Sequence, residues 1–163
     1  MTERTDVLLH ATAVALALDA DGPLAGALLL GPSGAGKSSL ALAAIASCPF
    51  ARTTLIADDQ VVIRAGGIAS APETLRGLIE IRGFGPARVK SVSAVRLAAA
   101  FELADIAERV PAPRRRQIAE GLALPFFPFS LTGAEATAAH RLRLIVRQVL
   151  CGQIGEETQD TKP

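Results

Sequence analysis

The segment Gly31-Pro32-Ser33-Gly34-Ala35-Gly36-Lys37-Ser38 fits the pattern G-x-x-x-x-G-K-S of a P-loop. It follows the apolar run 24–30 and precedes the alanine-rich stretch 39–46, so it lies between a predicted strand and a predicted helix. Such a loop points backbone N–H groups at phosphates, and the helix N-terminus adds a favourable field for their charge. The alternative is a purely structural role, a glycine-rich turn before a helix, but the flanking elements favour phosphate binding.

The P-loop also assigns roles to its polar residues. Lys37 is predicted to reach the β- and γ-phosphates of a nucleotide, and Ser38 to ligate Mg²⁺. The predicted nucleotide-binding residues are Gly31, Pro32, Ser33, Gly34, Ala35, Gly36, Lys37, Ser38 and Ser39. The motif therefore predicts a nucleotide and Mg²⁺ as cofactors.

The composition is that of a globular protein without a nucleic-acid partner. Half of the 163 residues are hydrophobic and one fifth are charged, which favours one compact domain with a core. We expect this domain over residues 1–152 and a polar tail without regular structure over 153–163. The net charge of +1 and the lack of Trp and Tyr give little attraction for phosphodiester backbones and few surfaces for base stacking.

The cysteines and the N-terminus indicate a cytoplasmic protein. Cys48 and Cys151 have no C-x-x-C partner, so a zinc site is not expected, and two lone thiols fit a reducing compartment. The apolar stretch 7–18 resembles a secretion signal, but Glu3 and Asp6 replace the basic residues that such a signal needs. No apolar run reaches the ~18 residues of a membrane span.

The order of predicted elements indicates an α/β fold. Strands are predicted at 8–18, 24–30, 53–57, 78–82 and 91–97, with a hairpin at 61–70 and a helical turn at 72–76. Helices are predicted at 36–47 and 134–150. Residues 109–130 hold four prolines and three consecutive arginines, so we expect a long loop there. The apolar stripe of the last helix is predicted to pack in the core, and comprises Ala136, Ala139, Leu142, Ile145 and Val149.

Two further segments carry groups suited to phosphoryl transfer. Asp58 and Asp59 end the strand after the P-loop helix, where one carboxylate can bind Mg²⁺ or take a proton from a hydroxyl. Because side chains alternate along a strand, we expect one of the two to face the phosphates and the other to face away. Glu80 and Arg82 share the polar face of the strand 78–82. The alternatives are a capped turn for the aspartates and a surface salt bridge for Glu80 and Arg82.

In this order, four segments resemble the catalytic domain of HPr kinase/phosphorylase. They are His10 on a first strand, G-P-S-G-A-G-K-S, L-I-A-D-D-Q-V and A-P-E-T-L-R-G-L-I-E-I-R-G-F-G, of which E-I-R-G-x-G is the most specific. The resemblance covers roughly residues 7–97. It implies a P-loop kinase domain with a central mixed β-sheet flanked by helices. That family phosphorylates a serine of HPr, the phosphocarrier protein of the bacterial sugar phosphotransferase system.

The resemblance implies a role for each matching residue. Lys37 and the P-loop hold the phosphates, Ser38 and Glu80 ligate Mg²⁺, and Asp58 takes the proton from the serine hydroxyl. His10 matches an active-site histidine, although a lone strand histidine is more often satisfied by a neighbour. Arg82 matches the catalytic stretch, and Asp59 is a further candidate metal ligand. The resemblance also implies a homo-oligomer, with a hexamer as one form.

The chain departs from the family at several places. Ser39 stands where members commonly carry glutamate, and Pro86-Ala87-Arg88 replaces aliphatic residues. With the P-loop at residue 31, the chain resembles the short proteobacterial form without a separate N-terminal domain. The arginine-bearing loop that the family uses for dephosphorylation has no match, because Arg114-Arg115-Arg116 comes too early. We read that triplet as a solvated loop, with docking of an acidic partner as the alternative.

Three functions are compatible with these residues. The leading hypothesis is an HPr serine kinase that uses ATP and Mg²⁺, with phosphorolysis of phosphoserine-HPr as a second activity. The runner-up is a P-loop kinase or ATPase that acts on a small molecule. The third is a nucleotide sensor without transfer activity, which the missing arginine loop and Ser39 favour.

Overall fold

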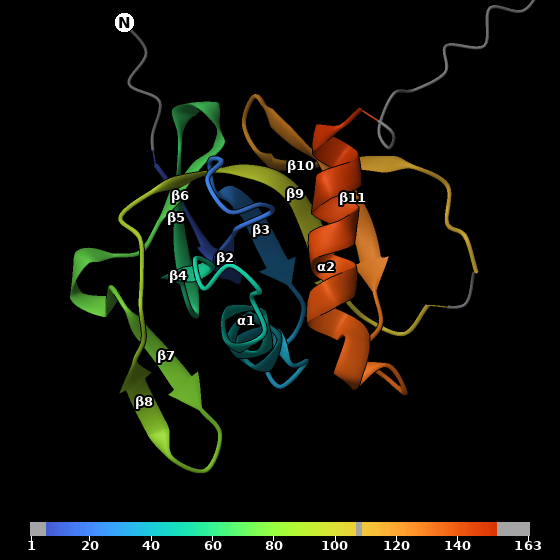
Figure 1. The fold of residues 1–163 in the computed structure, drawn as a ribbon. Helices are drawn as coiled ribbons and strands as arrows, with labels where there is room; N and C mark the ends of the chain where they lie inside the picture. The colour runs from blue at the N-terminus through green and yellow to red at the C-terminus, as the bar shows by residue number, and fades with distance from the viewer. Residues whose placement is uncertain (1–5, 107–108, 153–163) are drawn as a thin grey trace, which may run out of the picture.

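The computed structural model describes residues 6–106 and 109–152 and shows a mixed β-sheet with two α-helices packed against it (Figure 1). Within these residues the strands follow the order β1-β5-β6-β9-β3-β2-β4, and the hairpin β10–β11 joins the sheet at β9. β3 and β11 are both parallel to β9, whereas the other pairings are antiparallel. The predicted α/β fold is confirmed, while the predicted tail 153–163 lies outside the described residues.

The strands and helices have the following bounds. They are β1 (Val7–His10), β2 (Thr12–Leu16), β3 (Ala25–Leu30), α1 (Lys37–Ala46), β4 (Thr54–Ala57), β5 (Gln60–Arg64), β6 (Ile68–Ser70), β7 (Leu78–Ile81), β8 (Gly85–Arg88), β9 (Val95–Leu103), β10 (Arg114–Ala119), β11 (Leu122–Phe129) and α2 (Glu135–Leu150). The predicted strands at 24–30 and 53–57, the hairpin at 61–70 and both predicted helices are confirmed to within two residues.

The sheet separates two apolar layers because strand side chains alternate between its faces. Leu29 faces one layer, where it packs with Leu40 of α1 and Leu142 of α2. Leu28, the preceding residue, faces the other layer together with Ile63 of β5. Both helices therefore cover the same face of the sheet (Figure 1). On the opposite face the apolar layer is formed by side chains of the strands, among them those of β5 and β11.

The predicted strand 8–18 is two strands in the structure. β1 pairs with β5, whereas β2 pairs with β3 and β4. The break lies at Ala11, whose N–H donates to the carbonyl oxygen of Asp59 at 3.2 Å instead of continuing the ladder. Hydrophobic periodicity does not reveal such a break inside an apolar run. The break places His10 and Thr12 on either side of the turn that follows β4.

The predicted loop at 109–130 is wrong, because β10 and β11 form an antiparallel hairpin there. Two prolines lie inside β11, and proline cannot donate a hydrogen bond to a neighbouring strand. Pro125 is paired with Arg115 of β10, and Pro128 lies beyond the start of β10, where only β9 pairs with β11. A strand with one open edge tolerates proline, so proline content alone does not indicate a loop.

The arginine triplet forms the start of β10 instead of a solvated loop. Arg115 donates to the carbonyl oxygen of Ala123 at 2.7 Å, and Arg116 lies 3.4 Å from a carboxylate oxygen of Glu102. Arg116 also stacks over the ring of Phe126 at 5.1 Å. All three arginines are exposed on a strand with one open edge, and charged side chains protect such an edge from pairing with other chains.

Two other strand boundaries differ from prediction. The segment 83–86, expected to end the strand 78–82, instead turns the chain into β8, so that β7 and β8 form a separate hairpin. The strand expected at 91–97 begins four residues later and continues to Leu103, because β3 and β11 pair with its second half. Both differences depend on a partner strand that the local sequence does not specify.

The helix α2 is confirmed, but its predicted stripe is only partly correct. Ala139 and Leu142 are buried as predicted. Ala136 of the predicted stripe is exposed, whereas Val146, which was not part of the stripe, is buried. In the described residues, neither α-helix has the length and hydropathy needed to cross a membrane.

Arg143 of α2 supports the helix that follows the P-loop. Its buried guanidinium donates to the carbonyl oxygens of Ala44 at 3.4 Å and Ser47 at 3.2 Å, at the C-terminal end of α1. These carbonyls have no partner within α1, and a positive charge is favourable there. We expect Arg143→Met to lower the free energy of unfolding by about 1–3 kcal/mol. Urea denaturation measures this, and Arg64→Met, at an exposed ion pair, is the control; equal stability of both variants would contradict the prediction.

Candidate active site

The P-loop connects Leu30, the end of β3, to Lys37, the start of α1. Gly34 and Gly36 have φ values of +81° and +102°, which L side chains rarely adopt. A Cβ atom on Gly36 would also lie only 2.7 Å from Cδ1 of Leu131. Glycine at these positions therefore lets the backbone take the curved path that exposes its N–H groups to a phosphate.

Lys37 lies across the inside of this loop. Its side chain is buried, and its Nζ donates to the carbonyl oxygens of Gly31 at 2.7 Å and Pro32 at 2.9 Å. Phosphate oxygens are charged acceptors and form stronger hydrogen bonds than these neutral carbonyls. The ammonium group is thus held next to the position where phosphates are expected to bind.

Asp58 connects three parts of the chain at the end of β4. Its Oδ1 accepts hydrogen bonds from the hydroxyls of Thr12 at 2.8 Å and Ser38 at 2.7 Å. Its Oδ2 accepts the backbone N–H of Glu80 at 3.0 Å. The residue is only 7% exposed, so these donors replace the water that an ionised carboxylate needs. The carboxylate is held in one orientation beside the P-loop.

Asp59 faces the same pocket as Asp58, which contradicts the expected alternation. The residue has a φ of +66°, so the strand ends before it and the side chain does not turn to the opposite face. Its Oδ1 lies 3.1 Å from Nδ1 of His10, and both side chains are more than half exposed. His10 is therefore satisfied by a neighbour, as in the alternative considered above, and still lines the pocket.

Glu80 and Arg82 enter from the β7–β8 hairpin and complete the pocket. The guanidinium of Arg82 lies 3.6 Å from the point where a Cβ atom of Gly34 would stand, so it reaches the mouth of the P-loop. The pocket measures about 230 Å³ and is lined by His10, Thr12, Ser33, Gly34, Gly36, Lys37, Ser38, Ser39, Asp58, Asp59, Glu80 and Arg82.

The structure gathers nearly all predicted site residues around this pocket. Gly31, Pro32 and Ala35 do not line it; the first two contribute the carbonyls that Lys37 binds, and Ala35 donates its N–H to Pro32 at 3.1 Å. Thr12 is a residue that sequence reasoning missed. The only sequence signal for it was a hydroxyl in an otherwise apolar strand, which is common because threonine favours strands.

The oxygen groups of the pocket suit Mg²⁺. The hydroxyl of Ser38 and the carboxylates of Asp58, Asp59 and Glu80 are hard donors of the kind that this ion prefers. In residues 6–106 and 109–152, no group of three or more His, Cys, Asp or Glu side chains is arranged to hold a metal by itself. Mg²⁺ commonly uses one or two protein ligands together with water and phosphate oxygens. The donor set thus fits a metal shared with a nucleotide.

The arrangement has the parts that phosphoryl transfer requires. A curved backbone and a lysine can hold phosphates, an arginine can neutralise charge on a transferred group, and a buried carboxylate can accept a proton. The pocket faces solvent at His10 and Asp59, whose side chains are more than half exposed.

Part of the sequence is similar to that of two known proteins. Over 74 residues, 43% of this chain, the sequence is 43% identical to an HPr kinase/phosphorylase of Caldicellulosiruptor bescii and 46% identical to one of Caldanaerobacter subterraneus subsp. tengcongensis. The matched segment spans only 22% and 23% of these two relatives. No family model matches the chain.

A solved structure resembles almost the whole described fold. The structure of the Hpr(Ser) kinase/phosphatase from Coxiella burnetii has a TM-score of 0.71 to this one, at 21% sequence identity, and the alignment covers 90% of this chain and 92% of that chain. That protein therefore shares the fold of this chain. The sequence resemblance to HPr kinase/phosphorylases is confirmed over the 74 residues that match the two curated relatives.

Proposed function

We propose that this relative of the HPr kinase/phosphorylases is an ATP- and Mg²⁺-dependent protein kinase that phosphorylates a serine of HPr. The observation that carries this proposal is the set of contacts of Asp58. One buried carboxylate joins Ser38 of the P-loop at 2.7 Å to the N–H of Glu80 in the E-I-R-G segment at 3.0 Å. Two segments that carry the family resemblance thus meet at a proton acceptor beside the phosphate loop.

In the forward reaction the serine oxygen of HPr bonds to the γ-phosphorus of ATP. The bond from that phosphorus to the β–γ bridging oxygen breaks, ADP leaves, and the serine proton passes to Asp58. Oδ2 of Asp58 accepts one hydrogen bond in the described structure, from Glu80, and a carboxylate oxygen has two acceptor sites. This oxygen therefore has room for the serine proton.

The other pocket residues position and neutralise the phosphates. Lys37 and the P-loop N–H groups hold the β- and γ-phosphates, and Arg82 offsets charge on the transferred group. Ser38 and Glu80 would hold Mg²⁺, with Asp59 as a further ligand, and the ion would supply charge neutralisation between the phosphates. His10, which contacts Asp59 and lines the pocket, donates a hydrogen bond to a phosphate oxygen in this proposal.

A transfer assay tests this function. The purified chain is mixed with HPr, Mg²⁺ and ATP labelled at the γ-phosphate, and the expected product is label on a serine of HPr. Inorganic phosphate is then added, and release of the label from HPr would show the phosphorolytic direction. Folded protein that leaves HPr unlabelled would exclude the proposed function.

The same assay separates the other two candidate functions. A kinase or ATPase for a small molecule would turn over ATP without HPr. A nucleotide sensor would bind ATP in a titration and would transfer label to nothing. The cytoplasm, where ATP is available, is the compartment this function needs. A homo-oligomer is part of the proposal, because the resemblance implies one, and sedimentation equilibrium measures it.

Thr12 is expected to position Asp58 for this reaction. Its hydroxyl is fully buried and donates to Oδ1 of Asp58 at 2.8 Å. Thr12→Val keeps the shape of the side chain but removes this donor, so kcat for HPr should fall about 10- to 100-fold through misalignment. ATP affinity should not change. Thr12→Ser, which restores the hydroxyl, should recover most of the rate, and equal rates for the Val and Ser variants would contradict a positioning role.

A further inference from the structure

The β7–β8 hairpin carries exposed residues that the transfer chemistry does not use. It forms a two-stranded sheet of its own and projects from the body of the fold below α1 (Figure 1). We define its tip surface as three exposed residues: Phe84 at the turn, and Pro86 and Arg88, which follow it along β8 toward the base. We propose that this tip surface docks the protein substrate. On the substrate it would contact an apolar patch and an acidic side chain, both next to the acceptor serine. The proposal rests on the kinase function proposed above.

The base of the hairpin is fixed to the active site. Ile79 is 1% exposed and packs in the apolar layer beneath α1, and the N–H of the next residue, Glu80, binds Asp58. The N–H of Val89 donates to the carbonyl oxygen of Gly77 at 2.9 Å and closes the hairpin at its base. The tip is therefore held at a defined position relative to the carboxylate that accepts the proton.

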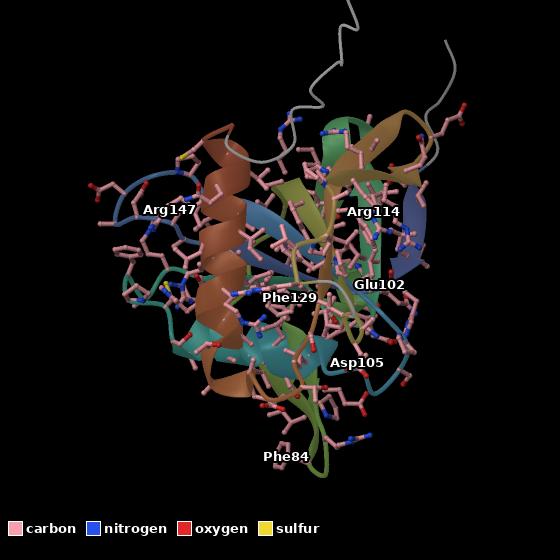
Figure 2. The ribbon with its side chains drawn as sticks, turned by 90° about the vertical axis from the view of Figure 1, so that its right-hand side faces the viewer. Phe84, Glu102, Asp105, Arg114, Phe129 and Arg147 are labelled. Carbon is pink, nitrogen blue, oxygen red and sulfur yellow. The ribbon has the colours of Figure 1, made fainter. Side chains whose placement is uncertain are left out.

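Phe84 is an unusual residue for the end of a hairpin. It is 77% exposed and lies at the outermost point of the hairpin (Figure 2). The turn depends on Gly83 and Gly85, whose φ values are +80° and +113°, and not on an aromatic side chain between them. By contrast, Phe101 and Phe129 pack against each other in the core. An exposed aromatic ring is typical of the anchor residues of protein interfaces.

The register of the hairpin places the rest of the tip surface on the side of the pocket. Glu80 is opposite Pro86, and Leu78 is opposite Arg88, so these residues share one face of the two strands. Glu80 lines the active-site pocket, and this face is therefore directed to it. In the part of the chain that the structure describes, Arg88 forms no ion pair. Its charge is available for an acidic group of a partner.

The size of this surface fits a protein and not a small molecule. Phe84 lies four residues along the chain from Glu80, which at the rise of a strand is on the order of 10 Å. A protein interface buries about 800 Å² on each partner, which corresponds to a radius of about 16 Å. A protein whose serine enters the pocket would thus reach the tip.

Steady-state kinetics and direct binding test the docking surface. We expect Phe84→Ala to raise the KM for HPr about tenfold and to weaken HPr binding in a calorimetric titration equally, with the KM for ATP unchanged. Arg88→Glu should raise the KM for HPr at low salt and lose this effect at high salt, because exposed charges are screened. Leu150→Ala, at an exposed apolar residue at the C-terminal end of α2, and Arg114→Glu, at a far edge of the fold (Figure 2), are the matched controls.

The outcomes separate this inference from the proposed function. Wild-type protein that neither binds nor labels HPr would overturn both. Wild-type protein that labels HPr with the same KM as Phe84→Ala would overturn the docking surface alone. An equal effect of Arg114→Glu and Arg88→Glu would indicate general charge attraction instead of docking at the hairpin. A change of oligomeric state in Phe84→Ala with an unchanged KM for HPr would identify a second copy of the chain as the occupant, and would also overturn the proposal.

Discussion

Asp58→Asn is expected to lower the rate of phosphoryl transfer to HPr about 10²- to 10⁴-fold, the range typical for loss of a general base. An amide cannot take the serine proton, whereas the substitution leaves the P-loop and Lys37, the proposed nucleotide-binding residues, in place. ATP affinity, measured by calorimetric titration, should therefore stay within a few fold of the wild-type value. Single-turnover transfer of label to HPr measures the loss.

The contacts of Asp58 also predict the cost of this substitution to the fold. The amide oxygen can still accept the hydroxyls of Thr12 and Ser38, but the amide nitrogen would then face the N–H of Glu80. Two opposed donors in a buried site cost about 1–3 kcal/mol. Thermal unfolding in the assay buffer should show that the variant is less stable but folded at the assay temperature.

Glu73→Gln is the matched control for Asp58→Asn. It makes the same change from carboxylate to amide at an exposed residue outside the pocket. Its transfer rate should equal that of the wild type. If Asp58→Asn kept the wild-type rate, Asp58 would not be the base, and the proposed mechanism would be wrong.

The parts of this structure that follow from local sequence were predictable. The curved path of a P-loop needs positive φ angles, which glycine permits. The apolar runs on both sides of the loop indicate a strand and a helix. The end of β4 placed Asp58 beside the P-loop because the strand follows the P-loop helix directly. The alternation along the strand 78–82 pointed to Glu80 and Arg82, the resemblance to a known family added His10, and the structure brings all three to the same pocket.

The features that escaped prediction depend on residues far apart in the sequence. Thr12 matters through Asp58, which lies 46 residues away, and a threonine in a strand has no local mark of that contact. The strand β11 forms although it contains Pro125 and Pro128, because β9 supplies a parallel neighbour and one edge stays open. Asp59 joins the pocket because its backbone is left-handed at φ +66°, which the rule of alternation does not anticipate.

The second large effect is expected from Lys37→Met, which should weaken ATP binding about 10- to 100-fold. In the described structure the ammonium group binds the carbonyls of Gly31 and Pro32, at 2.7 and 2.9 Å, so it already lies inside the loop. In the proposed complex, ATP replaces these neutral acceptors with charged phosphate oxygens, and hydrogen bonds to charged groups contribute more. The affinity lost in a calorimetric titration measures that difference.

Lys37→Met differs from Asp58→Asn in the step that it affects. In the proposed reaction Lys37 contacts phosphates both before and during transfer, so its loss should reduce ATP affinity as well as the transfer rate, whereas loss of Asp58 should reduce the rate alone. Lys90→Met makes the same change at an exposed lysine outside the pocket and should alter neither quantity. Because the methionine keeps the buried stem but cannot bind the carbonyls of Gly31 and Pro32, α1 should remain folded while the loop loses its internal contacts. Unchanged ATP affinity in Lys37→Met would show that the loop does not bind phosphates through this lysine, and would remove the basis for placing the nucleotide there.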